Sequence, residues 1–298
     1  MLNRSAASFE RGVRRRPTLL CAIAFGTSIF AAHGVGSVQE PIVVHDFADV
    51  GVSLMPPTTA QFDARMEALI ADVAGTAAAL KPYLVILSNH SKRTIVAYCV
   101  SFEMTDSTGR VHQSLVHFNY PNAVAESGVG QSGLPRGREV RPGEARVVGT
   151  NYEIMPEAGT WWLADFARSQ SERFKDTRKL VIGIDAVIFD DGTLVGEDTS
   201  ELQQAFEKYL NTTQEIYRSV VSRIDLGVSI DDVFQSLRGP AEDARAKVRG
   251  GDWSGFYYVQ AAGDVSRARK KIGDDRVRDV FEKAIRQTPF VVKRDSSK

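Results

Sequence analysis

The chain has 298 residues, of which 43% are hydrophobic, and its 37 basic and 37 acidic residues cancel in charge. This length and apolar content suit one large or two medium globular domains. The chain lacks the excess of basic residues that is typical of nucleic-acid-binding proteins, so we expect no nucleic acid partner. The two cysteines, Cys21 and Cys99, are too few for a disulfide framework.

The first 34 residues have the layout of a secretory signal peptide. Five arginines precede an uncharged apolar run at residues 18–32, and small residues follow at the end of that run. The run is shorter than the roughly 20 residues that cross a bilayer, and no later segment is long and apolar enough to span. We therefore predict a secreted or periplasmic protein, with an uncleaved N-terminal membrane anchor as the alternative. Removal of residues 1–34 leaves a net charge of −4.

An extended segment, PIVVH from Pro41, precedes an amphipathic helix within residues 58–80. Thr58 and Gln61 have the spacing of a capping box. Apolar side chains then recur as one helical stripe, which comprises Phe62, Met66, Leu69, Ile70 and Val73. A stripe of this kind must pack on an apolar surface elsewhere in the protein.

The middle of the chain reads as a series of strands. Three segments rich in β-branched and aromatic residues, 83–91, 94–106 and 111–120, are separated by short polar turns. Further strands are predicted at residues 144–150, 159–166 and 179–189. The last of these ends in an Asp191-Gly192 pair, which favours a type I′ turn. Because no helix separates neighbouring strands, the sheets should be antiparallel.

The second of these strands is apolar on both faces. One face carries large side chains, Val96, Tyr98, Val100, Phe102 and Met104. The other face carries Ile95, Ala97 and Cys99, where a solvated face would alternate to polar residues. We expect the helix within residues 58–80 to cover this second face near Cys99. Cys99 would then be an inert buried thiol.

Three glycines, Gly128, Gly130 and Gly133, have the G-x-G-x-x-G spacing of dinucleotide-binding loops. That motif requires a strand before it and a helix that begins within it. Here Pro135 and Pro142 interrupt any such helix. We therefore interpret residues 128–137 as a surface loop of unassigned role, and we expect no cofactor.

After Gly196 the pattern becomes helical. Asp198 and Glu201 have capping-box spacing, and a long apolar stripe runs from Leu202 to Ile224 before Gly227 ends it. Shorter helices are predicted near residues 229–237, 240–248, 255–272 and 274–287. They should form a small bundle with the long helix as its spine. The basic run that includes Arg267, Arg269, Lys270 and Lys271 is interpreted as a solvated face, with Asp274 and Asp275 beside it to offset the charge.

The histidines do not indicate a metal site. His112 and His117 are five residues apart on a predicted strand, which places them on opposite faces. His45 and His90 lie in other segments, and zinc needs three or four convergent ligands. A G-x-S-x-G nucleophile motif is also missing from the sequence. We therefore predict no metal and no catalytic residues.

Two features remain as candidates for function. Among four neighbouring aspartates, Asp190 and Asp191 are explained by a turn and Asp198 by a helix cap, which leaves Asp185 in need of a partner or a solvent opening. Adjacent strand residues point to opposite faces, so one ring of the pair Trp161 and Trp162 could be exposed. An exposed ring could stack on a sugar or anchor a partner. The alternative is that both are buried.

Three segments, SNHSKRTIVAYCVSFEMTDSTGR, RPGEARVV and IDAVIFDDGTLVGED, resemble the sandwich of uncharacterised secreted bacterial proteins with an immunoglobulin- or fibronectin-like core. The similarity covers about residues 80–198 and is one of pattern. It implies a binding or structural module and carries no active-site residues.

Together these observations predict an α+β protein, an antiparallel immunoglobulin-like β-sandwich with a covering N-terminal helix and an α-helical C-terminal region. The predicted parts are a signal peptide (1–34), an extended segment and helix (35–80), the sandwich (81–196) and the helical region (197–298). The expected function is non-catalytic binding of an envelope protein or glycan. The alternatives are a hydrolase of envelope polymers that uses Asp185 and a strand histidine, and a structural scaffold. Oligomeric state is left open.

Overall fold

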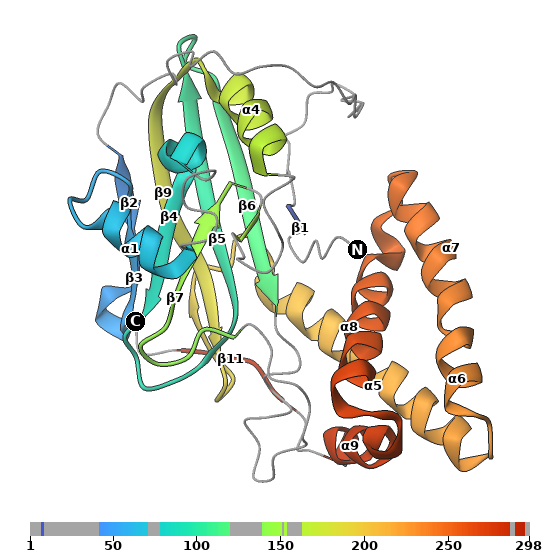
Figure 1. Cartoon of the computed structure of the whole chain (residues 1–298). Coiled ribbons are helices and arrows are strands. Elements are labelled where there is room, and N and C mark those ends of the chain that lie inside the picture. Colours follow the sequence, from blue (N-terminus) through green and yellow to red (C-terminus); the bar gives the residue numbers. More distant parts are fainter. Residues whose placement is uncertain are drawn as a thin grey trace.

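The computed structural model is a mixed α+β protein with two β-sheets and a group of helices beside them (Figure 1). It describes residues 7–8, 42–70, 78–119, 139–150, 152–153, 163–286 and 290–295. The predicted α+β class is confirmed. Within these ranges no helix has the length and apolar character needed to cross a membrane.

The larger sheet is built around three long antiparallel strands, in the order β6 (Val111–Asn119), β5 (Ile95–Asp106) and β9 (Thr177–Phe189). Four short strands extend it, namely β10 (Thr193–Gly196) and β2 (Val43–His45) on β9, β11 (Lys293–Arg294) on β10, and β1 (Ala7–Ser8) on β6. The sheet is mixed, because β2 runs parallel to β9 and β11 parallel to β10. The prediction of purely antiparallel sheets was wrong here. Both parallel strands reach the sheet through long connections, which parallel pairing requires.

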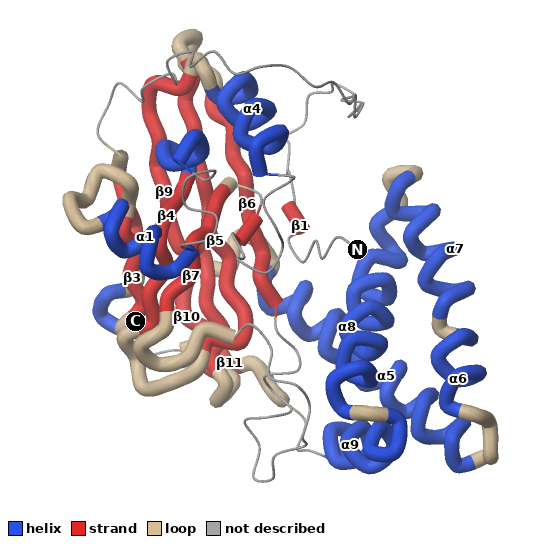
Figure 2. The backbone as a smooth tube through the Cα atoms, in the orientation of Figure 1, coloured by secondary structure: helices blue, strands red, loops and turns tan. Residues whose placement is uncertain are grey.

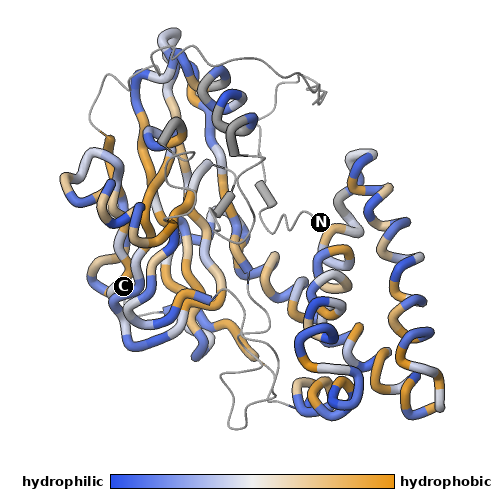
Figure 3. The backbone as a smooth tube through the Cα atoms, viewed as in Figure 1, coloured by the Kyte–Doolittle hydropathy of each residue, from blue (hydrophilic) through white to orange (hydrophobic). Residues whose placement is uncertain are grey.

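The smaller sheet has the order β3 (Val52–Met55), β4 (Leu84–Asn89), β7 (Ala145–Gly149) and β8 (Tyr152–Glu153), all antiparallel. Val85 and Leu87 of β4 belong to the same buried cluster as Val100 and Phe102 of β5. The two sheets therefore share one hydrophobic core. Figure 3 shows the apolar residues concentrated along these central strands.

The helix α1 (Phe62–Ile70) does not lie near Cys99, which corrects the sequence-based expectation. Its side chains Phe62, Met66 and Ile70 pack on the outer face of the smaller sheet, in a cluster with residues of β4 and β7. All six residues of β4 are buried, so this sheet also needs cover on both faces. A 3₁₀ segment, η2 (Ala78–Tyr83), joins α1 to β4.

Cys99 is covered by α5 (Leu202–Asp225) instead. Leu202 and Phe206, in its first two turns, are fully buried in the core that contains Cys99. The expectation that both faces of β5 are covered is confirmed, since Ile95, Ala97 and Cys99 are fully buried. Burial in apolar surroundings raises the pKa of the Cys99 thiol, which makes it unreactive.

The rest of α5 is the spine of a helical bundle, as predicted (Figure 2). The other members are α6 (Ile230–Ser236), α7 (Arg238–Arg249), α8 (Phe256–Ile272) and α9 (Asp274–Arg286). Tyr217 of α5 packs on Phe281 of α9 with ring centroids 4.4 Å apart. Within the basic run, Arg269 pairs with Asp274, as expected, and also with Asp231 of α6.

Two local predictions were wrong. Residues 163–166, predicted as part of a strand, begin the helix α4 (Leu163–Phe174), whose apolar and polar residues alternate at the helical period. The turn after β9 is not of type I′, because Gly192 has a positive φ of 84° and Asp191 does not. The Gly192 N–H instead bonds the Phe189 carbonyl at 3.0 Å, and the Asp191 carboxylate accepts the Thr193 N–H.

Candidate functional site

The connection from β10 to α5 has an uncommon backbone conformation. Asp198 and Glu201 have φ values of 57° and 58°, and they are the two non-glycine residues with positive φ in the ranges described above. Such conformations are unfavourable for residues with a Cβ and gather at functional sites. We call residues 197–201 the β10–α5 turn.

Asp198 caps the helix that follows the turn. Its carboxylate accepts the backbone N–H of Leu202 at 2.5 Å and that of Gln203 at 3.4 Å. The role predicted for Asp198 is therefore confirmed. Its partner in the predicted capping box, Glu201, directly precedes the helix and makes no side-chain cap bond. Burial raises the pKa of Asp198, although the N–H groups that it accepts oppose the shift.

Asp185 holds the turn against the larger sheet. It lies at an irregularity of β9, where Cys99 pairs with Ala186 and the next residue of β5 pairs with residue 184. Its carboxylate accepts the Thr199 N–H at 3.2 Å, the Thr199 hydroxyl, and the Ser200 N–H at 3.0 Å. The partner or solvent opening expected for Asp185 is thus a partner, the turn itself.

Replacing Asp185 by asparagine should lower the free energy of unfolding by about 1–2 kcal/mol, because an amide nitrogen cannot accept the N–H that a carboxylate oxygen accepted. Urea unfolding followed by circular dichroism measures the change. Asp243→Asn, at an exposed position of α7, is the control and should shift stability by less than about 0.5 kcal/mol. Equal effects of the two changes would contradict the anchoring role of Asp185.

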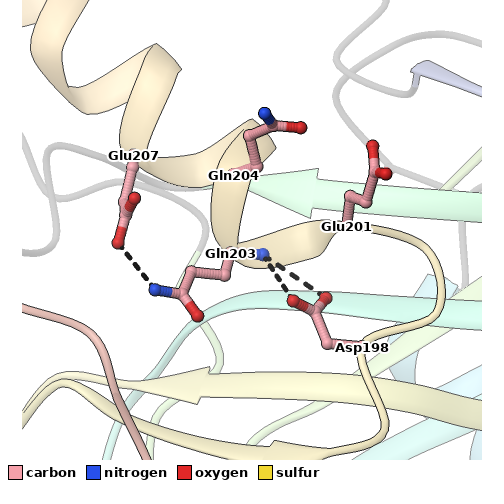
Figure 4. Close-up of a pocket in the computed structure, with 5 residues that line it drawn as sticks. All are labelled: Asp198, Glu201, Gln203, Gln204 and Glu207. Atoms are coloured by element: carbon pink, nitrogen blue, oxygen red, sulfur yellow. Dashed lines mark hydrogen bonds between the residues drawn. The ribbon is translucent and has the colours of Figure 1, made fainter.

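An open pocket lies directly beside the turn (Figure 4). Five polar residues of the turn and of the first two turns of α5 line it, namely Asp198, Glu201, Gln203, Gln204 and Glu207. The Gln203 amide donates to the Glu207 carboxylate at 2.9 Å. Three carboxylates and two amides can accept hydrogen bonds from hydroxyl or ammonium groups, and the amides can also donate. We call this feature the acidic pocket.

The residues of catalytic type near the turn are buried beneath it. Cys99 is fully buried, and His117 and Ser200 are 5% and 4% exposed. Burial raises the pKa of the Cys99 thiol, and this outweighs the opposing effect of its hydrogen bond with the Ser200 side chain. Burial likewise lowers the pKa of His117, although Asp185 opposes the shift. This cluster offers no solvent-exposed nucleophile.

The remaining sequence candidates are dispersed. His112 is exposed beside Asp106 at 3.4 Å, whereas His117 is buried, consistent with opposite faces. In the described ranges no three His, Cys, Asp or Glu side chains gather as metal ligands would. Trp161, Trp162 and residues 128–137 lie outside the described residues. The acidic pocket was missed because its glutamines and glutamates look like the solvated side of an amphipathic helix.

Comparisons with protein-family models, curated proteins and solved structures find no match to this chain.

Proposed function

We propose that the protein is an exported, non-catalytic binding protein of the cell envelope, and that the acidic pocket is its contact site for a partner protein or glycan. On this proposal the two sheets form an immunoglobulin-like sandwich that carries the β10–α5 turn. The observation that carries the proposal is the pocket of three carboxylates and two amides beside a turn held in an unfavourable conformation.

The proposal favours binding over catalysis because of where the reactive groups lie. Asp185, the acid of the hydrolase alternative, already accepts three hydrogen bonds from the turn. His117 interacts electrostatically with Asp185, which is the one observation that favours a hydrolase. However, His117 is buried, and a general base must reach a substrate within hydrogen-bond distance.

The assignment of the pocket as the contact site is tested by replacing two of its polar residues on α5 with alanine. The double change Gln204→Ala and Glu207→Ala should weaken retention of the natural ligand by tenfold or more, because both residues line the pocket (Figure 4). Alanine favours helix, so α5 should remain folded. Retention is measured by pull-down from separate protein and glycan fractions of the envelope, with full-length chain as bait.

The matched control is Glu215→Gln, an exposed position further along α5, which should leave retention unchanged. Trp161→Ala and Trp162→Ala are measured in parallel. Loss of binding with a tryptophan change, but not with the pocket change, would overturn the assignment of the pocket and move the contact site to the tryptophans.

A further inference from the structure

The His117 side chain is buried beneath the β10–α5 turn without a partner for one of its ring nitrogens. His117 Nε2 has no hydrogen-bond partner of suitable geometry within the described part of the chain. Buried polar groups in folded proteins are nearly always satisfied, so each exception calls for an explanation. His117 lies close to the turn, because Cys99 is directly opposite it in the pairing of β5 with β6, and Ser200 of the turn interacts with the Cys99 thiol.

The position of His117 places it in the layer between the larger sheet and α5. Residues directly opposite each other on antiparallel strands point to the same face. His117 therefore shares the face of Cys99, which the start of α5 covers. The titratable groups near His117 lie on three elements. They are Cys99 on β5, which pairs with it, and Asp185 on β9 and Glu201 at the start of α5, which interact with it electrostatically. The paired strand β1 contributes only Ala7 and Ser8.

We propose that His117 is an acid-sensitive latch, whose protonation releases the β10–α5 turn from the larger sheet and gives solvent access to Cys99. A charged imidazole cannot stay in this apolar layer without an acceptor for its new proton. The nearby carboxylate of Asp185 already binds Thr199 and Ser200. Opening of the turn hydrates the imidazolium and frees that carboxylate.

The direction of the pH effect follows from linkage. An unfolded or opened chain protonates His117 near its ordinary pKa of about 6.5. Burial lowers the pKa in the closed state, and the attraction of Asp185 and Glu201 opposes this only in part. The closed state is therefore fully favoured above about pH 6.5 and loses stability as the pH falls below that value.

Cys99 is the reporter for this opening. In the full chain with Cys21→Ser, Cys99 is the single cysteine. The rate at which 4,4′-dithiodipyridine labels this thiol is measured at pH 7.5 and at pH 5.5. Each rate is divided by the labelling rate of the same chain unfolded in guanidinium chloride at the same pH. The normalised rate should rise by up to about tenfold at pH 5.5. This is the largest increase in opening that one histidine can provide when the pH lies one unit below its pKa of about 6.5 in the opened state.

Two comparisons decide the outcome. In His117→Gln the normalised rate should not depend on pH. In a second chain, Cys21→Ser and Cys99→Ser are combined with Ala261→Cys, so that the only thiol lies in the bundle, where Ala261 is fully buried. Its normalised labelling rate should show no rise. This second chain keeps the test valid if His117→Gln fails to fold. An absent rise at Cys99, an equal rise in His117→Gln, or an equal rise at both thiol positions would overturn the proposal.

Discussion

Replacing Asn89 by alanine should lower the free energy of unfolding by about 3–4 kcal/mol, among the largest effects of any single change outside the apolar core. Asn89 is fully buried at the end of β4. Its amide nitrogen donates to the carbonyls of Arg93 and Val140, both at 2.7 Å. Its oxygen accepts the N–H and the hydroxyl of Ser91 at 3.0 and 2.7 Å.

The cost is large because Asn89 connects the two sheets. Val140 exchanges backbone hydrogen bonds with Ile95 at the start of β5, so the Asn89 amide joins the end of β4 to the larger sheet. Alanine would remove all four side-chain hydrogen bonds of Asn89 and leave a cavity in their place, and each lost hydrogen bond costs about 0.5–1.5 kcal/mol. Asn89→Asp retains the acceptor but loses the donor, and should also be destabilising.

Urea unfolding followed by circular dichroism checks this prediction. The neighbouring His90 is the matched control, because it is exposed and makes one side-chain hydrogen bond, to Ser53 at 3.1 Å. His90→Ala should change stability by less than about 0.5 kcal/mol. A loss below about 1 kcal/mol for Asn89→Ala would show that the amide does not tie the sheets together.

Gly196→Ala should destabilise the protein by about 3 kcal/mol or more, because two costs combine at this position. Gly196 ends β10 with a φ of 110°, where a Cβ is strained. A Cβ there would lie 2.2 Å from the carbonyl oxygen of Asp185 and 2.9 Å from the Cα of Ala186. Both contacts are with backbone atoms of β9, which cannot rotate away.

Gly109→Ala separates the two costs. Gly109 lies in the turn between β5 and β6 with a φ of 80°, and a Cβ there would meet no atom within 4 Å. This change should therefore cost only about 1–2 kcal/mol, from conformation alone. Thermal and urea unfolding of both variants give the comparison. Equal losses would mean that the close approach of β10 to β9 contributes nothing.

The elements that the sequence predicts well are those in which one local pattern determines the outcome. The apolar stripe that begins with Leu202 and Phe206 predicts α5, because its apolar residues recur at the helical period over many turns. The strand around Cys99 is predicted for a similar reason, since β-branched and aromatic residues fill it. The bundle helices follow because glycines such as Gly227 and Gly273 separate them.

The features that the sequence does not predict depend on contacts between distant residues. Nothing local distinguishes whether α1 or α5 covers Cys99, because both have an apolar stripe of suitable width. The anchoring of the turn by Asp185 joins groups 14 residues apart. The positive φ of Glu201 is also not predicted, because among residues with a Cβ only Asn and Asp visit that conformation with any frequency.

The two attachment points of the helical bundle have a consequence for how it can move. The chain leaves the larger sheet at Gly196, directly after β10, and its last described strand, β11, pairs in parallel with that same β10. Lys293 lies opposite Thr193 in this pairing. The bundle is therefore joined to the sheet at two neighbouring positions on one strand, and the start of α5 is also buried in the sheet core. A body held in this way cannot drift away from the sheets on a flexible tether.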